Sequence, residues 1–187
     1  MQHPLENIPN EYRKRLFFAF LFLTIALFAI FRILDQPLRT PAAPNGIVSF
    51  ELGRTPEKAF QILVSWEPVL NQGVAIQKAK LFAAFGLGID YLFMPLYAFA
   101  LAFGTLLAAG KHSGWIKSLG AVAGYGAFAA ALFDAVENYA LFQILLNRVY
   151  SLYPEIAFYC ASIKFGLLIF GLLYALVGWL LPRKVTT

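Results

Sequence analysis

The chain has 187 residues, of which 60% are hydrophobic and only 13% are charged, whereas ordinary soluble domains are about 45–50% apolar and about 25% charged. This excess argues against a soluble domain, and the net charge of +5 does not indicate nucleic-acid binding, because the basic residues flank apolar blocks and form no basic face with exposed aromatic side chains. The single cysteine, Cys160, excludes an intrachain disulfide and a thiol metal site.

The first apolar block covers residues 16–34 and follows a basic run that begins at Arg13. It is long enough to cross the hydrocarbon core as a helix, so it predicts a signal anchor. A cleaved signal peptide is the alternative, but the length of the block and Pro41 argue against it. The block is rich in Phe and Leu and lacks a stripe of small residues, so we expect this helix at the periphery of the bundle.

Residues 35–80 form the only sizeable polar segment. Thr55 and Pro56 are typical of an N-cap and the first turn of a helix. Phe60, Leu63 and Trp66 then follow at helical spacing. The pattern predicts a short amphipathic helix in the first outer loop, which lies in the membrane interface or docks on the end of the bundle or on a partner.

Three further apolar blocks cover residues 81–109, 119–146 and 156–181. Each is long enough to span a bilayer, and their short connections favour antiparallel neighbours. The predicted fold class is therefore all-α, a transmembrane four-helix bundle, organised as a single membrane domain over residues 1–187.

Basic residues near the ends of the spans predict the orientation. Only Arg148 lies in the short loop on one side. On the other side lie Arg13, Lys14, Arg15, Lys111, Lys117, Arg183 and Lys184. We therefore expect a multi-pass membrane protein with both termini cytoplasmic, in contact with the lipid bilayer.

The spans carry polar residues at membrane depth. Asp90 lies in the second block, Asp134, Glu137 and Asn138 lie in the third, and Lys164 lies in the fourth. With a rise of about 1.5 Å per residue, Asp90, Glu137 and Lys164 each lie roughly 12–14 Å below the outer boundary. They are expected to share one layer, with Asp134 one turn deeper.

Small residues share helix faces with these polar side chains, which predicts close helix packing and polar side chains that point into the bundle. The glycines on these faces are Gly86, Gly104, Gly120, Gly124, Gly171 and Gly178.

Ionised side chains at the centre of a span cost about 2.5–3.5 kcal/mol each, so we expect them to be paired. Lys164 can pair with Glu137 or Asp90, which leaves two surplus carboxylates to be balanced by Arg32, a proton or a bound cation. Two interpretations stay open. The cluster is a network of ion pairs and hydrogen bonds that fixes helix register, or it is a proton, cation or polar-substrate site.

No motif indicates a catalytic site or a cofactor. Asp134, Glu137 and Asn138 resemble half of a helical metal site, but both histidines, His3 and His112, lie outside the apolar blocks. There is no Gly-rich phosphate loop and no nucleophile elbow. We expect no metal, no cofactor and no enzymatic activity, with an intramembrane enzyme that acts on lipid as the alternative.

Three segments carry a resemblance to a family: 52–59 with Ser65 and Trp66, then 90–93, then 134–138. Over roughly residues 50–145 the chain resembles small uncharacterised bacterial four-span membrane proteins. The resemblance implies the architecture and a location in the bacterial inner membrane, and it implies no chemistry. Our first functional hypothesis is a non-enzymatic accessory or scaffolding subunit, bound to other membrane subunits or to its own copies. The second is a small proton- or cation-coupled transporter or channel.

Overall fold

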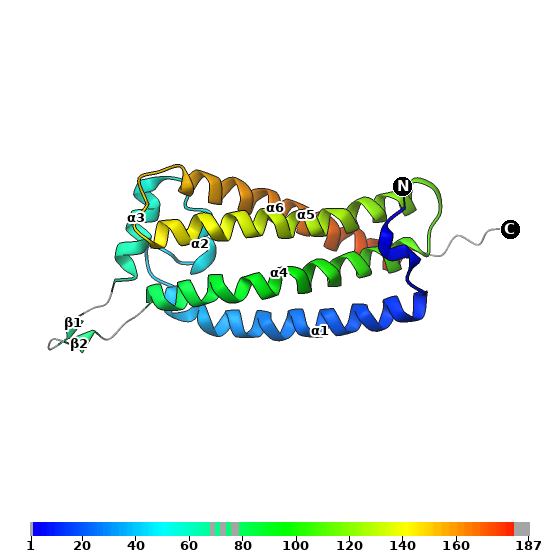
Figure 1. The fold of residues 1–187 in the computed structure, drawn as a ribbon, viewed down its shortest axis with the longest axis horizontal. Helices are drawn as coiled ribbons and strands as arrows, with labels where there is room; N and C mark the ends of the chain where they lie inside the picture. The colour runs from blue at the N-terminus through cyan, green and yellow to red at the C-terminus, as the bar shows by residue number, and fades with distance from the viewer. Residues whose placement is uncertain (1, 68–69, 72–73, 76–78, 182–187) are drawn as a thin grey trace. The chain divides into compact units, whose positions relative to one another are not determined.

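The computed structural model of the chain describes residues 2–67, 70–71, 74–75 and 79–181, and its fold is all-α (Figure 1). The two-residue strands β1 and β2 pair antiparallel, with Leu70 opposite Ala75. The elements in chain order are the 3-10 helix η1 (Pro4–Asn7), α1 (Asn10–Leu34), the 3-10 helix η2 (Gln36–Leu38), α2 (Ile47–Glu51), α3 (Pro56–Ser65), β1 (Leu70–Asn71), β2 (Val74–Ala75), α4 (Ala79–Ala109), α5 (Gly114–Leu145) and α6 (Tyr153–Leu180).

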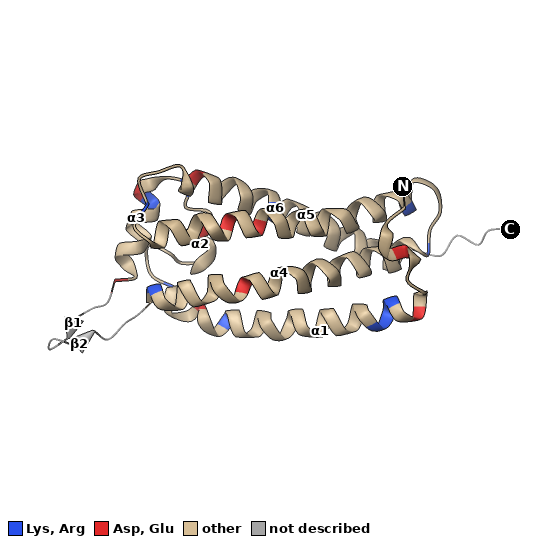
Figure 2. Ribbon diagram, in the orientation of Figure 1, with Lys and Arg blue, Asp and Glu red and all other residues tan. Residues whose placement is uncertain are grey.

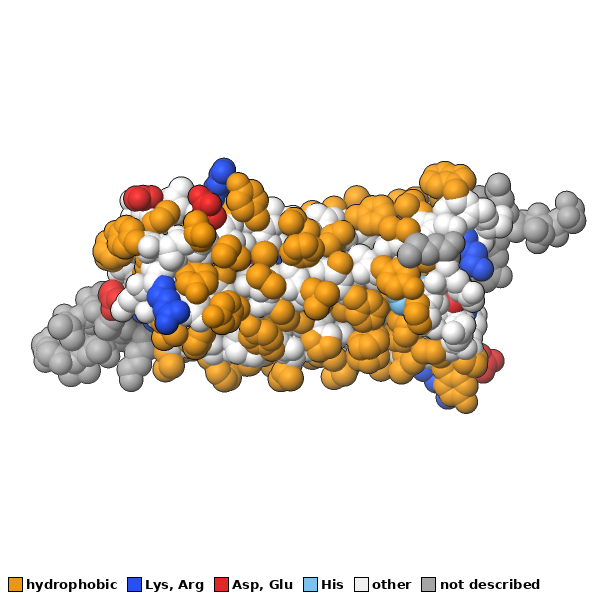
Figure 3. Space-filling model, turned by 45° about the horizontal axis from the view of Figure 1, so that its top comes forward, with side chains coloured by type: hydrophobic (Ala, Val, Ile, Leu, Met, Phe, Trp, Pro, Cys, Tyr) orange, Lys and Arg blue, Asp and Glu red, His pale blue; other side chains and the backbone are white. Residues whose placement is uncertain are grey.

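Four of the described helices, α1, α4, α5 and α6, are long and apolar enough to cross a membrane. Each coincides with one predicted apolar block, and the helices begin two to six residues before the blocks. Apolar side chains cover much of their surface (Figure 3). The chain therefore has the helices of a multi-pass membrane protein, and the predicted fold class is confirmed.

The chain packs as two compact units, and the first comprises Met1–Ala26, Phe93–Leu132 and Ile163–Thr187. Small residues fill much of its core, including Ala102, Ala108 and Ala127. The N-terminal part of α1 packs on α4 through aromatic rings, with the Phe20 and Phe99 centroids 5.0 Å apart. None of the 25 residues of α1 is buried, as expected for a helix at the periphery.

The second unit comprises Leu27–Leu92 and Phe133–Ser162, and it contains α2 and α3. Thr55 caps α3 by accepting a hydrogen bond from the Lys58 N–H at 3.2 Å, so the predicted amphipathic helix is confirmed. Leu63 and Trp66 are buried in a core that they share with the parts of α4, α5 and α6 in this unit. Phe60 lies on the exposed face of α3. The helix therefore docks on these three helices, and we call α2, α3 and their connections the cap.

Two hydrogen bonds between residues far apart in the sequence hold the cap in place, together with one local ion pair. The indole Nε1–H of Trp66 donates to the carbonyl oxygen of Leu38 at 2.8 Å. The mostly buried carboxylate of Asp35 accepts from the Ile47 N–H at 2.8 Å and pairs with Arg39 at 2.9 Å. At Gly46 the backbone has a φ of +59°, and a Cβ there would collide with the Asp35 carboxylate, so this turn requires glycine.

Candidate functional site: polar residues of α4 and α5

The polar residues predicted at membrane depth include four that lie in the second unit. Asp90 is on α4, and Asp134, Glu137 and Asn138 are on α5. Figure 2 shows acidic residues along both helices. Asp134 and Asn138 share a helix face because they are four residues apart. The three residues of α5 are buried, with exposed fractions of 3% or less, and Asp90 is half-buried. The expectation that these side chains avoid the outer surface therefore holds best for α5.

Asn138 joins α5 to α4 by two hydrogen bonds. Its Nδ2 donates to Oδ2 of Asp90 at 2.9 Å and to the carbonyl oxygen of Leu87 at 3.2 Å. Both partners are acceptors, so they fix the orientation of the amide, with its nitrogen toward α4. These bonds match the interpretation in which polar residues fix the register of neighbouring helices.

The amide oxygen of Asn138 is in a different situation. Within the described residues it is buried and has no hydrogen-bond donor. A buried polar atom without a partner costs about 1–3 kcal/mol. A protonated carboxyl group, a water molecule or a cation would satisfy this oxygen, so the second interpretation of the cluster also has a specific atom to support it.

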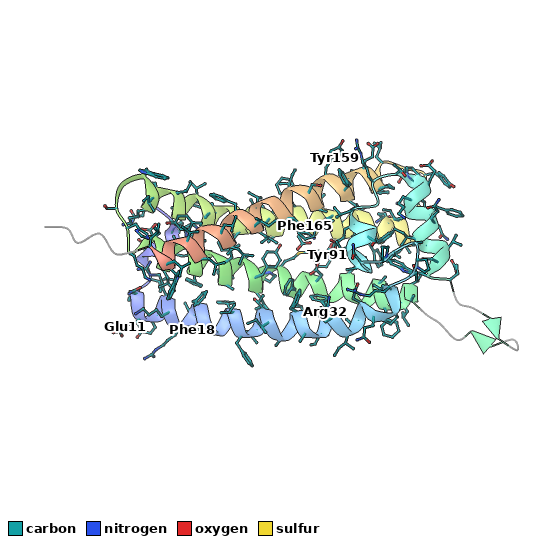
Figure 4. The ribbon with its side chains drawn as sticks, turned by 180° about the vertical axis from the view of Figure 1, so that it is seen from behind. Glu11, Phe18, Arg32, Tyr91, Tyr159 and Phe165 are labelled. Atoms are coloured by element: carbon teal, nitrogen blue, oxygen red, sulfur yellow. The ribbon has the colours of Figure 1, made fainter. Side chains whose placement is uncertain are left out.

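Tyr91 provides another contact between α4 and α5. Its hydroxyl donates to the carbonyl oxygen of Ala135 at 3.2 Å. The side chain is exposed, unlike the neighbouring Asn138 contact, and Figure 4 labels it on α4. No sequence pattern indicates this bond, because a tyrosine in an apolar span is equally typical of a lipid-facing position.

Lys164 belongs to the first unit, where it is buried with its ammonium nitrogen 4.8 Å from the centroid of the Phe165 ring. Its predicted pairing with Glu137 or Asp90, and the layer that the three would share, stay predictions. Arg32 lies in the last turn of α1 and is exposed, so it is not among the buried polar side chains (Figure 4).

The glycines on the polar faces pack closely in the first unit. A Cβ built on Gly120 would lie 2.5 Å from the Cβ of Ala109, and one built on Gly171 would lie 2.8 Å from the Leu101 side chain. Gly104, Gly124 and Gly178 also have atoms within 3.0–3.3 Å of an added Cβ. Gly86, in the second unit, has no described atom within 4 Å of such a Cβ. The expected close packing at Gly86 is therefore corrected, since that face of α4 has room for a side chain.

A buried histidine in the first unit was not predicted. The exposed fraction of His3 is 3%, and its ring lies 4.3 Å from the Tyr125 ring. Its Nδ1 accepts from the Leu5 N–H at 3.2 Å, while Glu6 accepts from the His3 N–H at 3.1 Å. Burial lowers the pKa of His3, and the negative charge of Glu6 acts in the opposite direction. The spacing of His3 and Glu6 is that of a capping box, the one local signal for this arrangement.

Among the described residues, no group of three or more His, Cys, Asp or Glu side chains is arranged to hold a metal ion. Comparison of the chain with protein-family models, with curated proteins and with solved structures finds no match. The resemblance to small four-span membrane proteins therefore stays a prediction.

Proposed function

We propose that the chain is a non-enzymatic accessory subunit of a larger assembly in a bacterial inner membrane, with both termini cytoplasmic. The outer face of α1 is the observation that carries this proposal. Phe18, Phe22 and Ile25, all in the first unit, are between 58% and 69% exposed. At about 100° per residue these three side chains fall within about 60° of the helix circumference. They form a row of large apolar side chains, which we call the α1 ridge.

A ridge of this kind suits packing against another membrane helix. Association between helices in lipid depends on van der Waals packing, because lipid tails are as apolar as the side chains. Large side chains that project from a helix with no buried residue can insert between the side chains of a partner. The contacts of Asn138 and Tyr91 support the same proposal, since they join α4 to α5 and so serve the integrity of the subunit.

Purification of the full chain in mild detergent, followed by mass spectrometry of the intact complex, tests the proposal. We expect a stoichiometric partner, which is another protein or a second copy of the chain. Phe22→Ala combined with Ile25→Ala should release it. A matched control is Leu172→Ala combined with Leu176→Ala, which alters exposed apolar residues of α6. A wild-type chain that always emerges alone refutes the proposal.

The Asn138 amide oxygen favours a second candidate, a small proton- or cation-coupled carrier. The buried amide oxygen is a ligand for a cation, and the Asp90 carboxylate bound to the nitrogen of the same amide is a group that can carry a proton at membrane depth. Flux into liposomes should then be slowed by Asp134→Asn and by Glu137→Gln. Glu155→Gln, at an exposed carboxylate in the first turn of α6, is the control. Absence of flux in the wild type, or flux that the two buried substitutions leave unchanged, rejects transport.

A further inference from the structure

Arg54, in the turn that precedes α3, lies on two aromatic side chains of α6 in the second unit. Its guanidinium carbon is 5.3 Å from the centroid of the Phe158 ring and 5.6 Å from that of the Tyr159 ring. A guanidinium N–H donates to the Tyr159 hydroxyl oxygen at 3.1 Å. The two rings also contact each other edge to face, with centroids 5.5 Å apart. The cation is therefore held in one position on the side of α6.

The depth of this position follows from the sequence of α6. Its apolar block begins at Ile156, and Tyr159 is three residues further along the helix, which is about 4.5 Å along the axis. Arg54 and Tyr159 are both exposed, so the unit does not cover them. Figure 4 labels Tyr159 on α6. In a membrane this is the boundary between the hydrocarbon and the headgroups, where tyrosine and arginine side chains are favoured.

The charge of Arg54 needs a partner at that boundary. In the part of the chain that the structure describes, no carboxylate lies within ion-pair distance of its guanidinium. An arginine has five N–H donors in a planar fork, and the Tyr159 hydroxyl takes one of them. The remaining donors match the paired oxygens of a phosphate group. The backbone of Arg54 has a φ of +41°, in the left-handed region that side chains other than glycine uncommonly adopt.

We propose that Arg54 binds the phosphate of a phospholipid headgroup, with the Phe158 and Tyr159 rings holding the guanidinium at headgroup depth. The site is independent of the partner proposed for the α1 ridge, because it requires only that the chain lie in a bilayer. The ligand of this site is a phosphodiester, so its binding differs from nonspecific contact with the acyl chains of lipids.

The test uses the full chain in mild detergent and counts bound lipid by mass spectrometry of the intact protein. Phosphatidylglycerol, diacylglycerol with the same acyl chains, and inorganic phosphate are titrated separately. We expect Arg54→Gln to weaken the binding of phosphatidylglycerol by about tenfold, since a hydrogen bond between two charged groups is lost. Arg54→Lys should bind phosphatidylglycerol more weakly than the wild type and more tightly than Arg54→Gln, because lysine keeps the charge and loses the planar fork of donors. Arg148→Gln, at an exposed arginine of the α5–α6 connection, is the matched control and should bind as the wild type does.

A second variant separates lipid binding from the stability of the cap. Tyr159→Phe keeps the ring and removes the hydroxyl acceptor, so it should retain phosphatidylglycerol even if the thermal unfolding temperature falls. The proposal is overturned if Arg54→Gln binds phosphatidylglycerol as tightly as the wild type does, or if diacylglycerol binds equally well. Equal losses of binding and of unfolding temperature in Arg54→Gln and Tyr159→Phe would assign the effect to a loosened cap and also overturn it. Tight binding of inorganic phosphate, without binding of phosphatidylglycerol, would also overturn the proposal and would identify the ligand of Arg54 as a soluble anion.

Discussion

The hydrogen bond between Asn138 and Asp90 allows a quantitative test of the structural role of the polar residues. A double-mutant cycle with Asn138→Ala, Asp90→Ala and the double variant isolates this bond. Asn138→Ala also removes the bond to the Leu87 carbonyl oxygen, but it does so both with and without Asp90, so that loss cancels in the cycle. The coupling energy therefore reports only the contact between the amide nitrogen and the carboxylate.

The expected magnitude follows from the contact itself. Hydrogen bonds between membrane helices give coupling energies of about 0.6 kcal/mol on average and about 1.7 kcal/mol at most. The nitrogen and oxygen atoms are 2.9 Å apart, and Asn138 is 1% exposed. A carboxylate acceptor strengthens a hydrogen bond when it is ionised, so we expect a coupling of about 1–1.7 kcal/mol.

Reversible unfolding in mixed detergent micelles, monitored by tryptophan fluorescence, measures the unfolding free energies of the wild type, the two single variants and the double variant. The control cycle combines Asp90→Ala with Ser151→Ala. Among the described residues, the Ser151 hydroxyl bonds only within its own turn, to the Arg148 carbonyl oxygen and from the Tyr153 N–H. That cycle should show a coupling below about 0.5 kcal/mol. A coupling between Asn138 and Asp90 that is as small as the control would refute the conclusion that this bond joins α4 to α5.

Three further predictions concern residues outside the polar cluster. Trp66→Phe should lower the unfolding free energy by about 1–3 kcal/mol, because the buried Leu38 carbonyl oxygen loses its donor; chemical denaturation measures the change. Gly120→Ala should destabilise the protein by about 1–3 kcal/mol, since its Cβ would meet the facing alanine of α4, whereas Gly166→Ala, with no described atom within 4 Å of the added Cβ, should not. Because burial lowers the pKa of His3, the unfolded chain binds a proton first, so stability should be complete above pH 6.5 and fall as the pH drops below 6.5 toward the folded pKa. Unfolding curves over this range should lose that dependence in His3→Phe.

The four spans were predictable because hydrophobic length is a local property. An uninterrupted apolar block has few alternatives to a membrane helix, whatever its neighbours are. The same holds for α3, because Thr55 and Pro56 determine the start of the helix within a few residues. The contact between Trp66 and Leu38 was beyond local reasoning, since it joins residues 28 positions apart.

The polar residues and the glycines show where helical periodicity stops being informative. Periodicity gives the angle of a residue on its own helix, but it does not say which neighbour faces that residue at a given height. Gly86 and Gly104 share a predicted face of α4, yet only Gly104 has a close neighbour, the Phe17 ring of α1. His3 was missed for a related reason, since its burial depends on how the chain folds back before α1.

The two interpretations of the polar cluster make different demands on the two ends of the Asn138 amide. In a network that fixes helix register, the amide nitrogen is the important atom because it donates the hydrogen bonds to α4. Both Asn138→Leu and Asn138→Asp remove this nitrogen. In a cation site, the amide oxygen is the important atom because it binds the cation, and only Asn138→Asp keeps an oxygen there. This substitution also places a second carboxylate next to Asp90. We expect both variants to have a lower free energy of unfolding than the wild type. The value for Asn138→Asp should be the lowest because of this like-charge contact.

The dependence on cations then separates the interpretations. Unfolding is measured in sodium chloride and in choline chloride at equal ionic strength, because choline is too large to enter a buried oxygen site. If the cluster only joins helices, the exchange should leave the wild type, Asn138→Leu and Asn138→Asp unchanged relative to one another. Selective stabilisation of Asn138→Asp and the wild type by sodium would instead show that the carboxylates and the amide oxygen hold a cation. That result would favour the carrier over the accessory subunit, since an oxygen site that recruits a cation at membrane depth does more than fix helix register.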